Sequence, residues 1–562
     1  MSASRRVAVL CTSRDLFTEN CISALTALRW DVQVLRLAPV TLGEFVLAGE
    51  RTFDQWVMSW EQDPPEFCLG VNLNGVPAPV ADWCAWRGRA FVNWLVDHPA
   101  LFPQAWKCQE PWLVLACLDQ SHVDWLEARR LGPQWLMPMG VPPEFLGERK
   151  TVALKAPVFA GYFRSADTEE YLRRAIEAGR ERTPLQGTAV ETSLIASLDE
   201  GAAALAQARD WQEVAPRLHA ELSRHGLADH GAAWGYAFFK ASQLRRCAVL
   251  QAAVAEGLHV FGDSDWQPHL GGAWRGLVPY QKLANLFHEA VVSLNIHNPQ
   301  NSCEPNSRAW EVTGAGGCLL TDRVLHLEQY YEPGVEVWTW DSLAEARDKL
   351  RFLSVHVDVR DRVAAAGMAR ARQCHTMVHR LEALVRQLQE RGFLESAQRP
   401  VARLRAGLLS AALRTGQCDQ VMRLAKEWLG LEPTSAEPLF YMGTVAVMQG
   451  QWREAITLLR HVEKRRPLCA AAAGNLVVAL ARSEQWDQAQ QVLAGVSLAA
   501  ASPALRATLH THAGNLMEQR GDPAQGQKCW REALECDAGA GAAQANLKGG
   551  QALKWAVAMV FE

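Results

Sequence analysis

The chain has 562 residues, with 57 Lys and Arg against 61 Asp and Glu and a formal net charge of -4. This length exceeds what one hydrophobic core organises, so we expect several domains. The balanced charge, with no long basic run, excludes the pattern typical of nucleic-acid-binding proteins, and no stretch approaches the roughly 20 apolar residues of a membrane span. The 14 cysteines are scattered without a Cys-x-x-Cys pair. The apolar run after Arg6 is shorter than the core of a signal peptide, so we predict a reduced, cytoplasmic protein.

The first part of the chain alternates apolar runs with helical patterns. Each run ends in polar or acidic residues, as strands of a parallel sheet do when helices cover both of its faces. The runs are residues 6–10, 30–37, 67–73, 90–97 and 111–119. They predict a doubly wound, Rossmann-like domain over residues 1–150 that closes at the prolines of 138–145.

A second series of the same kind contains a helical insertion. The insertion is rich in Ala, Glu and Arg and covers about residues 167–230. The apolar runs of this series are 156–163, 257–263, 290–297, 317–322 and 335–340, and helical patterns fill 341–394. They predict a second Rossmann-like domain over residues 151–395 that includes the closing helices. Two such domains in tandem suit a ligand cleft between them.

From about residue 400 the strand patterns end and a 34-residue period begins. Gly416-Gln417, Gly450-Gln451 and Glu484-Gln485 mark the period, and Gly521-Asp522 is a looser copy. Helix-turn-helix units of this length are typical of tetratricopeptide repeats, so we predict an all-α solenoid over residues 396–562. Such arrays usually bind a peptide or protein. They equally serve self-association, which would make the protein a homo-oligomer.

A polar loop follows the apolar run that ends near Asn295. Asn306 or Ser307 is suited to cap a helix that begins near Arg308, and the N–H groups of a helix start bind anions such as a diphosphate. Arg308 would add a charge-assisted contact. Glu311, one turn further, would accept two hydroxyls of a ribose. These residues predict a nucleotide-binding loop.

The small residues Gly314-Ala315-Gly316-Gly317 come directly after this helix. One interpretation is a helix end whose glycines serve as its cap before a buried strand. The other is that a small polar ligand fits against the bare backbone. The residues alone leave both open.

The stretch PNSRAWEVTGAGGCLLTD (305–322), with LEQYYEPGVEVWTW after it, resembles the carboxyl-terminal half of GT-B glycosyltransferases of the spore-maturation-protein type. The similarity extends to VFAGYFR, VFGDSDW and, more weakly, WLVDHP. It implies a GT-B fold of two Rossmann-like domains, the second of which binds a nucleotide sugar. It also implies that Glu311 holds the ribose, Arg308 the diphosphate, and that Gly314, Gly316 and Gly317 approach the donor.

Four residues upstream lie in stretches that share the resemblance. Gly161 would let the backbone approach a phosphate, and Arg164 would bind it, although a loop arginine is more often simply solvated. Asp263 and Tyr280 would lie in the base-binding region, where Tyr280 would stack on or hydrogen-bond with the nucleobase, unless it is an ordinary tyrosine at the edge of the core.

Three further residues are candidates for catalysis. Asp97 and His98 follow a buried strand, and an imidazole held by a carboxylate would deprotonate an acceptor hydroxyl. The alternative is an aspartate that caps a helix beside a surface histidine. Asp119 and His122 are weaker candidates of the same kind.

Glu304 departs from the spacing of retaining GT-B enzymes, which often have seven residues between two glutamates. Six residues separate Glu304 from Glu311. Glu304 either reaches the sugar or is a loop residue, and the stereochemistry of transfer stays open.

We expect a glycosyltransferase that uses a nucleotide-sugar donor and whose repeats recruit a protein acceptor such as a flagellar or surface polypeptide. We find no Asp-x-Asp on a polar loop that would hold a metal for the diphosphate, and in a GT-B fold basic side chains and helix dipoles can neutralise the leaving group instead, so we expect neither a metal nor another cofactor. A nucleotide-sugar epimerase of GT-B layout and a non-catalytic repeat scaffold are the alternatives. The donor base, the sugar and the acceptor are not encoded in any pattern that we recognise.

Overall fold

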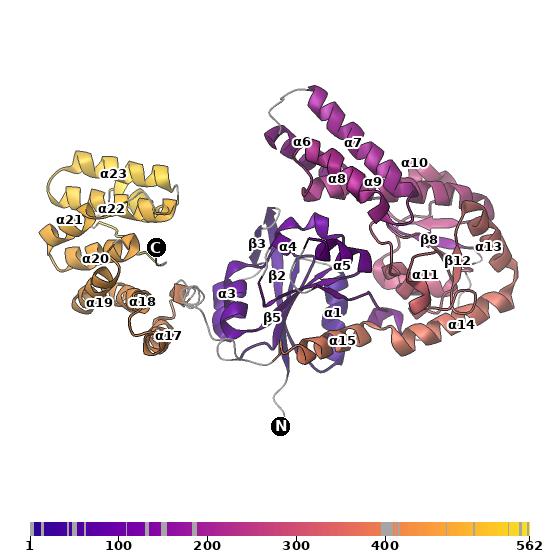
Figure 1. Ribbon diagram of the computed structural model, residues 1–562, viewed down its shortest axis with the longest axis horizontal. Coiled ribbons are helices and arrows are strands. Elements are labelled where there is room, and N and C mark those ends of the chain that lie inside the picture. Colours follow the sequence, from indigo (N-terminus) through magenta and orange to yellow (C-terminus); the bar gives the residue numbers. More distant parts are fainter. Residues whose placement is uncertain are drawn as a thin grey trace. The chain divides into compact units, whose positions relative to one another are not determined.

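The structure is a computed structural model (Figure 1). It describes residues 5–558 and 561, except 13–15, 42–43, 48–52, 61–62, 108–109, 130–133, 148–153, 155, 183–187, 395–408, 411, 414–415, 468, 498–500, 538 and 550–552. The chain divides into two compact units. The first comprises Met1–Gly49, Pro65–Pro77 and Arg89–Ser396, and the second comprises Glu50–Pro64, Ala78–Gly88 and Ala397–Glu562.

The first sheet has seven strands in the order β3-β2-β1-β4-β5-β6-β7, and only β3 is antiparallel to its neighbour among these described strands. The strands are β1 (Arg6–Thr12), β2 (Asp31–Thr41), β3 (Glu44–Leu47), β4 (Phe67–Val71), β5 (Ala90–Leu95), β6 (Leu113–Cys117) and β7 (Gln134–Leu136). The helices of this part are α1 (Leu16–Ala27), α2 (Phe53–Trp60), α3 (Ala78–Arg87), α4 (Pro103–Lys107) and α5 (Gln120–Glu127). The strand order reverses between β1 and β4, which is where doubly wound sheets bind ligands.

The second sheet is fully parallel, in the order β12-β11-β10-β8-β9. Its strands are β8 (Val158–Ala160), β9 (His259–Phe261), β10 (Ser293–Asn295), β11 (Leu319–Asp322) and β12 (Trp338–Trp340). Every apolar run that we predicted as a strand contains one. The edge strands β3 and β7 were not predicted.

The predicted insertion is helical and longer than expected. It consists of α6 (Ser165–Arg182), α7 (Thr188–Gln207), α8 (Ala215–Arg224) and α9 (Gly231–Ala253), and α9 packs against both α6 and α7. The later helices are α10 (Gln267–Leu270), α11 (Tyr280–Glu289), α12 (Ser307–Gly314), α13 (Leu343–Val355), α14 (Val357–Cys374) and α15 (Met377–Glu390). α9 ends at the turn that precedes β9.

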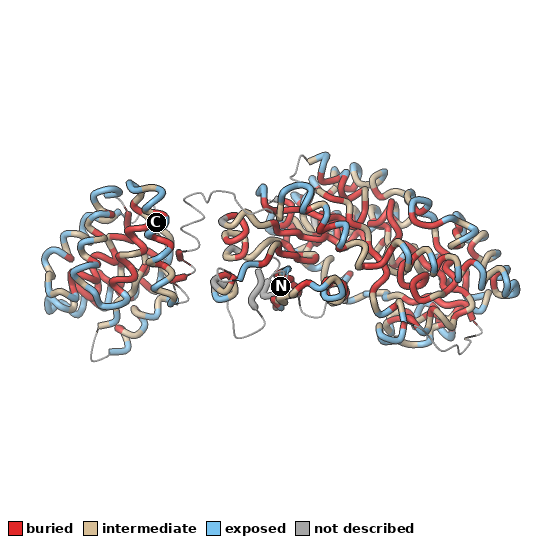
Figure 2. Tube along the Cα trace, turned by 90° about the horizontal axis from the view of Figure 1, so that it is seen from below, coloured by how far each residue is buried: buried red, intermediate tan, exposed pale blue. Residues whose placement is uncertain are grey.

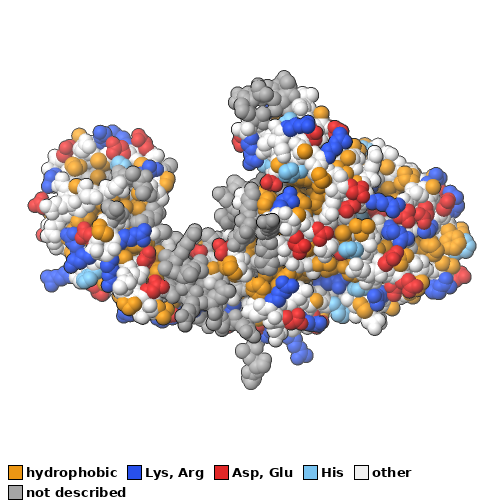
Figure 3. Space-filling view, in the orientation of Figure 1, with side chains coloured by type: hydrophobic (Ala, Val, Ile, Leu, Met, Phe, Trp, Pro, Cys, Tyr) orange, Lys and Arg blue, Asp and Glu red, His pale blue; other side chains and the backbone are white. Residues whose placement is uncertain are grey.

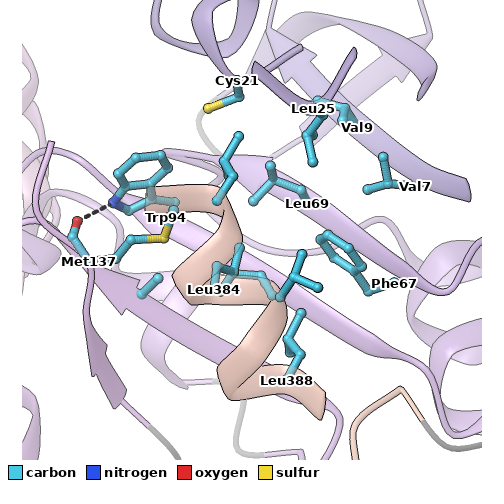
Figure 4. Packing of buried hydrophobic residues seen from close by; sticks show 14 of the residues in the cluster. Val7, Val9, Cys21, Leu25, Phe67, Leu69, Trp94, Met137, Leu384 and Leu388 are labelled. Carbon is cyan, nitrogen blue, oxygen red and sulfur yellow. Dashed lines mark hydrogen bonds between the residues drawn. The ribbon is translucent and has the colours of Figure 1, made fainter. Parts of the chain in front are cut away.

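The core of the first sheet includes a helix that we had assigned to the second domain (Figure 4). Leu384 and Leu388 of α15 pack with Phe67, Leu69 and other buried residues of the first sheet. Strands β4, β5 and β6 are buried along their whole lengths, as parallel strands covered on both faces are. The closing helix therefore lies on the first sheet, because its apolar stripe faces that core.

After residue 408 every regular element that the structure describes is a helix, as the 34-residue period predicted. The helices are α17 (Cys418–Leu431), α18 (Glu437–Met448), α19 (Trp452–Arg465), α20 (Ala470–Arg482), α21 (Trp486–Ala494), α22 (Pro503–Gln519), α23 (Pro523–Cys536) and α24 (Gly541–Leu547). The period reflects one backbone conformation. Gly416, Gly450 and Gly521 precede second helices with positive φ angles of 71°, 72° and 79°, and Glu484 holds the same position at 61°.

The fold thus consists of two Rossmann-like α/β sheets and an all-α repeat array, as predicted. Buried residues run through both sheets and the array (Figure 2). Acidic and basic side chains are interspersed on the face drawn in Figure 3. Among the described residues, no helix combines the length and apolarity that crossing a membrane requires.

Candidate functional site

A cavity of about 540 Å³ lies between the carboxyl ends of the two sheets. Its wall includes Asn20 of α1 and Asp97 after β5 from the first sheet, and Gly161 after β8 and the start of α12 from the second. A second cavity of about 220 Å³ shares Asp97, Gly161 and the start of α12. The location agrees with the topological rule for ligand sites in α/β sheets.

The start of α12 faces both cavities. Asn306 is the N-cap, and its Oδ1 accepts a hydrogen bond from the backbone N–H of Ala309 at 3.2 Å. Asn295 donates from Nδ2 to Oδ1 of Asn306 at 3.0 Å, which fixes the cap. Ser307 and Arg308 line both cavities. The predicted capped helix start is therefore present and open to the cavities, and anion binding there stays a prediction.

Three arginines converge on the smaller cavity: Arg164, Arg308 and Arg246 of α9. Arg246 donates from Nη1 to the carbonyl of Tyr162 at 2.9 Å and from Nη2 to Oδ1 of Asn298 at 2.8 Å. Burial, together with the positive charges of Arg164 and Arg308, lowers the pKa of Arg246 to about 10. Its buried Nε has no hydrogen-bond partner among the described residues. Like charges gathered in this way make the electrostatic potential in the cavity positive.

Glu311 lies in a chain of polar contacts at the wall of the larger cavity. It forms an ion pair with Arg308, and its Oε1 accepts a hydrogen bond from the hydroxyl of Tyr280 at 3.1 Å. Nδ2 of Asn20, in α1, donates a hydrogen bond to the same hydroxyl oxygen at 3.4 Å. Burial raises the pKa of Glu311, while Arg308 and Tyr280 oppose the shift. Glu311 is thus oriented and reachable, as a ligand for hydroxyl groups requires.

Asp97 lines both cavities and is held by two amides. Asn72 donates to its Oδ2 at 2.8 Å and Gln300 donates to its Oδ1 at 2.8 Å. The backbone N–H of Val96 donates to Oδ1 of Asn72 and fixes the orientation of that amide. The backbone N–H of His98 donates to Oε1 of Gln300 in the same way. Both carboxylate oxygens therefore accept hydrogen bonds while the group faces the cavities.

His98 does not line either cavity, so the structure corrects its predicted role as a base. It is fully buried, and its ring lies 4.3 Å from Trp211 and 4.8 Å from His122, measured between ring centroids. Its Nδ1 accepts the backbone N–H of Ala100 at 3.0 Å. Burial and the nearby His122 and Arg129 hold the pKa of His98 well below its usual value. The insertion supplies Trp211, which is why the sequence near His98 gave no sign of burial.

Glu304 is also fully buried and lines neither cavity, so its catalytic assignment is replaced by the loop-residue interpretation. Its Oε2 accepts the backbone N–H of Gln120 at 2.6 Å, and its Oε1 contacts Nδ1 of His326 at 2.8 Å. Burial and the charge of Asp119 raise its pKa to about 7. Asp119 itself accepts the backbone N–H groups of Cys303 and Glu304 at 3.0 Å, so both acids fix the same loop.

One group of side chains has the composition of a metal site. Atoms of Cys303, Glu304 and His326 that could bind a metal lie within 4.8 Å of one another, and no other such group occurs among the described residues. None of the three lines either cavity.

Asp263 serves the site indirectly. Its Oδ1 accepts the backbone N–H of Phe163 at 3.0 Å, and its Oδ2 accepts that of Arg164 at 3.0 Å. It does not line either cavity. Asp263 therefore fixes the loop that presents Gly161 and Arg164, and it is a positioning residue rather than a contact for the base.

Gly314, Gly316 and Gly317 line neither cavity, which contradicts the role that the resemblance implied for them. A Cβ on Gly314 would lie 2.1 Å from Cγ1 of Val141, and one on Gly317 would lie 2.4 Å from the backbone oxygen of Phe287. Gly316 has a φ of 79°. The helix-end interpretation is the right one: the glycines let α12 pack closely and turn into β11.

The comparisons with known proteins agree with the two parts of this chain. Residues 245–386 match a family model described as glycosyl transferase-like, and residues 446–513 match one described as tetratricopeptide repeat. No curated protein matches the sequence.

Three solved structures illustrate the similarities. HepE of Anabaena, solved with UDP and glucose, has 12% identity over 69% of this chain and 100% of its own, with a TM-score of 0.37. Sucrose-phosphate synthase of Thermosynechococcus elongatus has 10% identity over the same shares, with a TM-score of 0.36. MamA of Desulfovibrio magneticus RS-1 has 28% identity over 24% of this chain and 76% of its own, with a TM-score of 0.21. From the family matches, the chain carries a glycosyl transferase-like domain, which includes most of the cavity residues from the second sheet, and tetratricopeptide repeats.

Proposed function

We propose that the protein transfers a sugar from a nucleotide-sugar donor to a polypeptide acceptor. One observation carries the proposal: Arg164, Arg246, Arg308 and the start of α12 converge on cavities that Asp97 also faces. The site therefore offers an anion-binding surface and, opposite it, a carboxylate from the other sheet.

The donor's diphosphate would bind at the three arginines and the helix start. Charge develops on the leaving diphosphate during transfer, and fixed cations and N–H groups stabilise it without reorganisation. For this reason we propose that transfer needs no metal. Glu311, held by Arg308 and Tyr280, would accept ribose hydroxyls, and the cavity volume of about 540 Å³ suits a nucleoside diphosphate sugar.

Asp97 would act on the acceptor. Substitution at an anomeric carbon passes through an oxocarbenium-like transition state, and the acceptor must lose a proton as it attacks. Asp97 is the one carboxylate that faces both cavities among the described residues. We assign it as the general base, in place of His98.

The repeat array supports a polypeptide acceptor, because solenoids bind extended partners. A flagellar or surface protein is the acceptor class that we propose. A cytoplasmic location remains a prediction from the sequence.

The test is nucleotide binding followed by turnover. Calorimetric titration with UDP, GDP and dTDP does not depend on the acceptor, and Arg246→Gln should weaken binding of the preferred nucleotide about 100-fold. Arg173→Gln is the matched control, since Arg173 is an exposed arginine of α6 outside the cavities. The matching nucleotide sugars are then incubated with the protein, and nucleoside diphosphate release is measured.

The outcomes separate the three functions. Release from one donor that Arg246→Gln abolishes supports a transferase. Sugar isomerisation with nucleotide release and no acceptor product would indicate an epimerase. Absence of binding for every nucleotide would overturn the enzyme proposal and leave the repeat scaffold.

A further inference from the structure

An extended segment of the chain, residues 553–558 with Phe561, lies against the first helices of successive repeats. The segment has neither helix nor strand structure. It contacts side chains of α20, α22 and α24, and its main chain makes the hydrogen bonds. We call the surface that these helices present to it the inner groove.

Two asparagines hold the segment at positions four residues apart. Asn475 of α20 donates from Nδ2 to the carbonyl of Ala558 at 2.9 Å and accepts that residue's N–H at 2.7 Å. Asn546 of α24 does the same with Lys554, at 3.0 and 2.7 Å. Each carboxamide thus pairs with one residue's N–H and C=O, as a neighbouring strand would.

Side chains of α22 hold the middle of the segment. His512 contacts the carbonyl of Ala556 through Nε2 at 2.9 Å, so this nitrogen carries the proton, and Asn515 donates to the carbonyl of Lys554 at 2.8 Å. Trp530 donates to Oδ1 of Asn515 at 3.0 Å and fixes its orientation. His512, Asn475 and Asn515 are fully buried.

Two aromatic side chains of the segment also contact the repeats. The ring of Trp555 lies 5.4 Å from that of His512, and the ring of Phe561 lies 5.3 Å from that of Phe440 in α18. Arg466 lies over the Phe561 ring at 5.1 Å. The residues between the two aromatics that contact the groove through their main chain are small.

We propose that the inner groove is a receptor for an extended polypeptide and that residues 553–558, with Phe561, occupy it as a built-in competitor. Main-chain pairing does not read a sequence, so a partner segment with two aromatics around small residues would satisfy the same carboxamides. A buried carboxamide without a partner is costly, so the segment leaves only when another backbone replaces it. The chain's own segment would then block the inner groove until a partner segment with two aromatics around small residues displaces it.

This inference does not rest on sugar transfer, because every residue in it belongs to the second compact unit, which contains the repeats. The probe is a fluorescent peptide with the sequence of residues 551–562, QALKWAVAMVFE, measured by anisotropy against the full chain and against a chain that ends at Gly549. We expect the shortened chain to bind the peptide at least tenfold more tightly. Asn475→Ala in the shortened chain should lower its affinity for the peptide at least tenfold, and a scrambled peptide should not bind. Gln488→Ala, an exposed carboxamide of α21, is the matched control and should change nothing.

Equal affinity of the two chains for the peptide would overturn the proposal. If the shortened chain does not fold, by circular dichroism, Trp555→Ala with Phe561→Ala in the full chain replaces it, and this variant should bind the peptide at least tenfold more tightly than the unaltered chain. Unchanged affinity there would equally overturn the proposal. Light scattering decides whether the occupant comes from the same chain, because a dimer that dissociates when residues 550–562 are removed would contradict the built-in competitor.

Discussion

Gln300 donates a hydrogen bond from Nε2 to Oδ1 of Asp97 at 2.8 Å, and the two residues follow strands of different sheets. The same glutamine accepts the backbone N–H of His98 through Oε1 at 3.3 Å and contacts Nε2 of His122 through its backbone carbonyl at 2.8 Å. One residue of the polar loop after β10 thus orients the carboxylate that we assign to the acceptor. The carboxylate that we propose as the general base is therefore positioned by the half of the protein that would bind the donor.

Asp97→Asn tests this assignment. The amide keeps the size of the side chain but cannot accept a proton, so we expect turnover to fall between 100- and 10,000-fold. Binding of the nucleoside diphosphate, which would contact the arginines, should change less than threefold. Initial rates and calorimetric titration measure the two quantities. Equal losses of binding and turnover would mean that Asp97 only supports the fold of the site.

How far sequence patterns predicted the fold depended on the apolar runs around each strand and not on strand length, since β8 and β9 have only three residues each and were predicted. The long apolar runs all contain strands, because burial on both faces of a parallel sheet imposes an apolar run. Strands β3 and β7 lie at the edges of the first sheet and were not marked by a run of this kind.

The residues of the site were predictable where helix capping determines them, as at Asn306 and Ser307. Arg246 was missed because an arginine in a long helix is ordinarily solvated, and the insertion separates it from Gly161. His98 and Gly314 were misassigned for a common reason. A buried histidine resembles a loop histidine in sequence, and a glycine that packs on Val141 resembles one that meets a ligand.

Glu304 makes stability depend on pH. Its pKa is about 7 in the folded protein against 4.5 for the free side chain, so the folded state holds a proton that the unfolded state releases. The contribution of this proton to the free energy of unfolding is fully present below pH 4.5 and is lost as the pH rises through 7. Glutamine does not titrate, so the Glu304→Gln variant should not lose this stability as the pH rises.

Chemical denaturation of both proteins at pH 4.5, 6 and 7.5 measures the effect. The stability of the natural protein relative to Glu304→Gln should decrease along this series. Glu328→Gln, an exposed carboxylate nearby in sequence, is the control and should show a constant difference. A constant difference for Glu304→Gln as well would contradict the raised pKa.

Gly314→Ala should destabilise the protein by about 1–3 kcal/mol, because the new Cβ would lie 2.1 Å from Cγ1 of Val141. A loss of stability would point to the close contact, because alanine favours a helix over glycine and would otherwise stabilise α12. Adding Val141→Ala should recover part of the loss, so the two changes would be non-additive. Gly272→Ala is the control, as no atom would lie within 4 Å of a Cβ added there. Thermal unfolding measures the stability of Gly314→Ala, Val141→Ala, the double variant and Gly272→Ala. If the stability losses of the two single changes add up in the double variant, the close contact between Gly314 and Val141 is contradicted.

Glu484→Gly should stabilise the repeat array. Glu484 has a φ of 61° at the turn position where Gly416 and Gly450 occur in the other repeats. A side chain with a Cβ pays about 1–2 kcal/mol for this conformation, and glycine does not, although glycine also gains entropy in the unfolded state. We therefore expect a net gain of roughly 0.5–1 kcal/mol. Glu484→Ala removes the charge but keeps the Cβ, so it should gain nothing, and Gly450→Ala should lose about 1 kcal/mol. Thermal unfolding of the three variants separates backbone strain from charge, because a gain for Glu484→Ala equal to that for Glu484→Gly would assign the effect to the carboxylate.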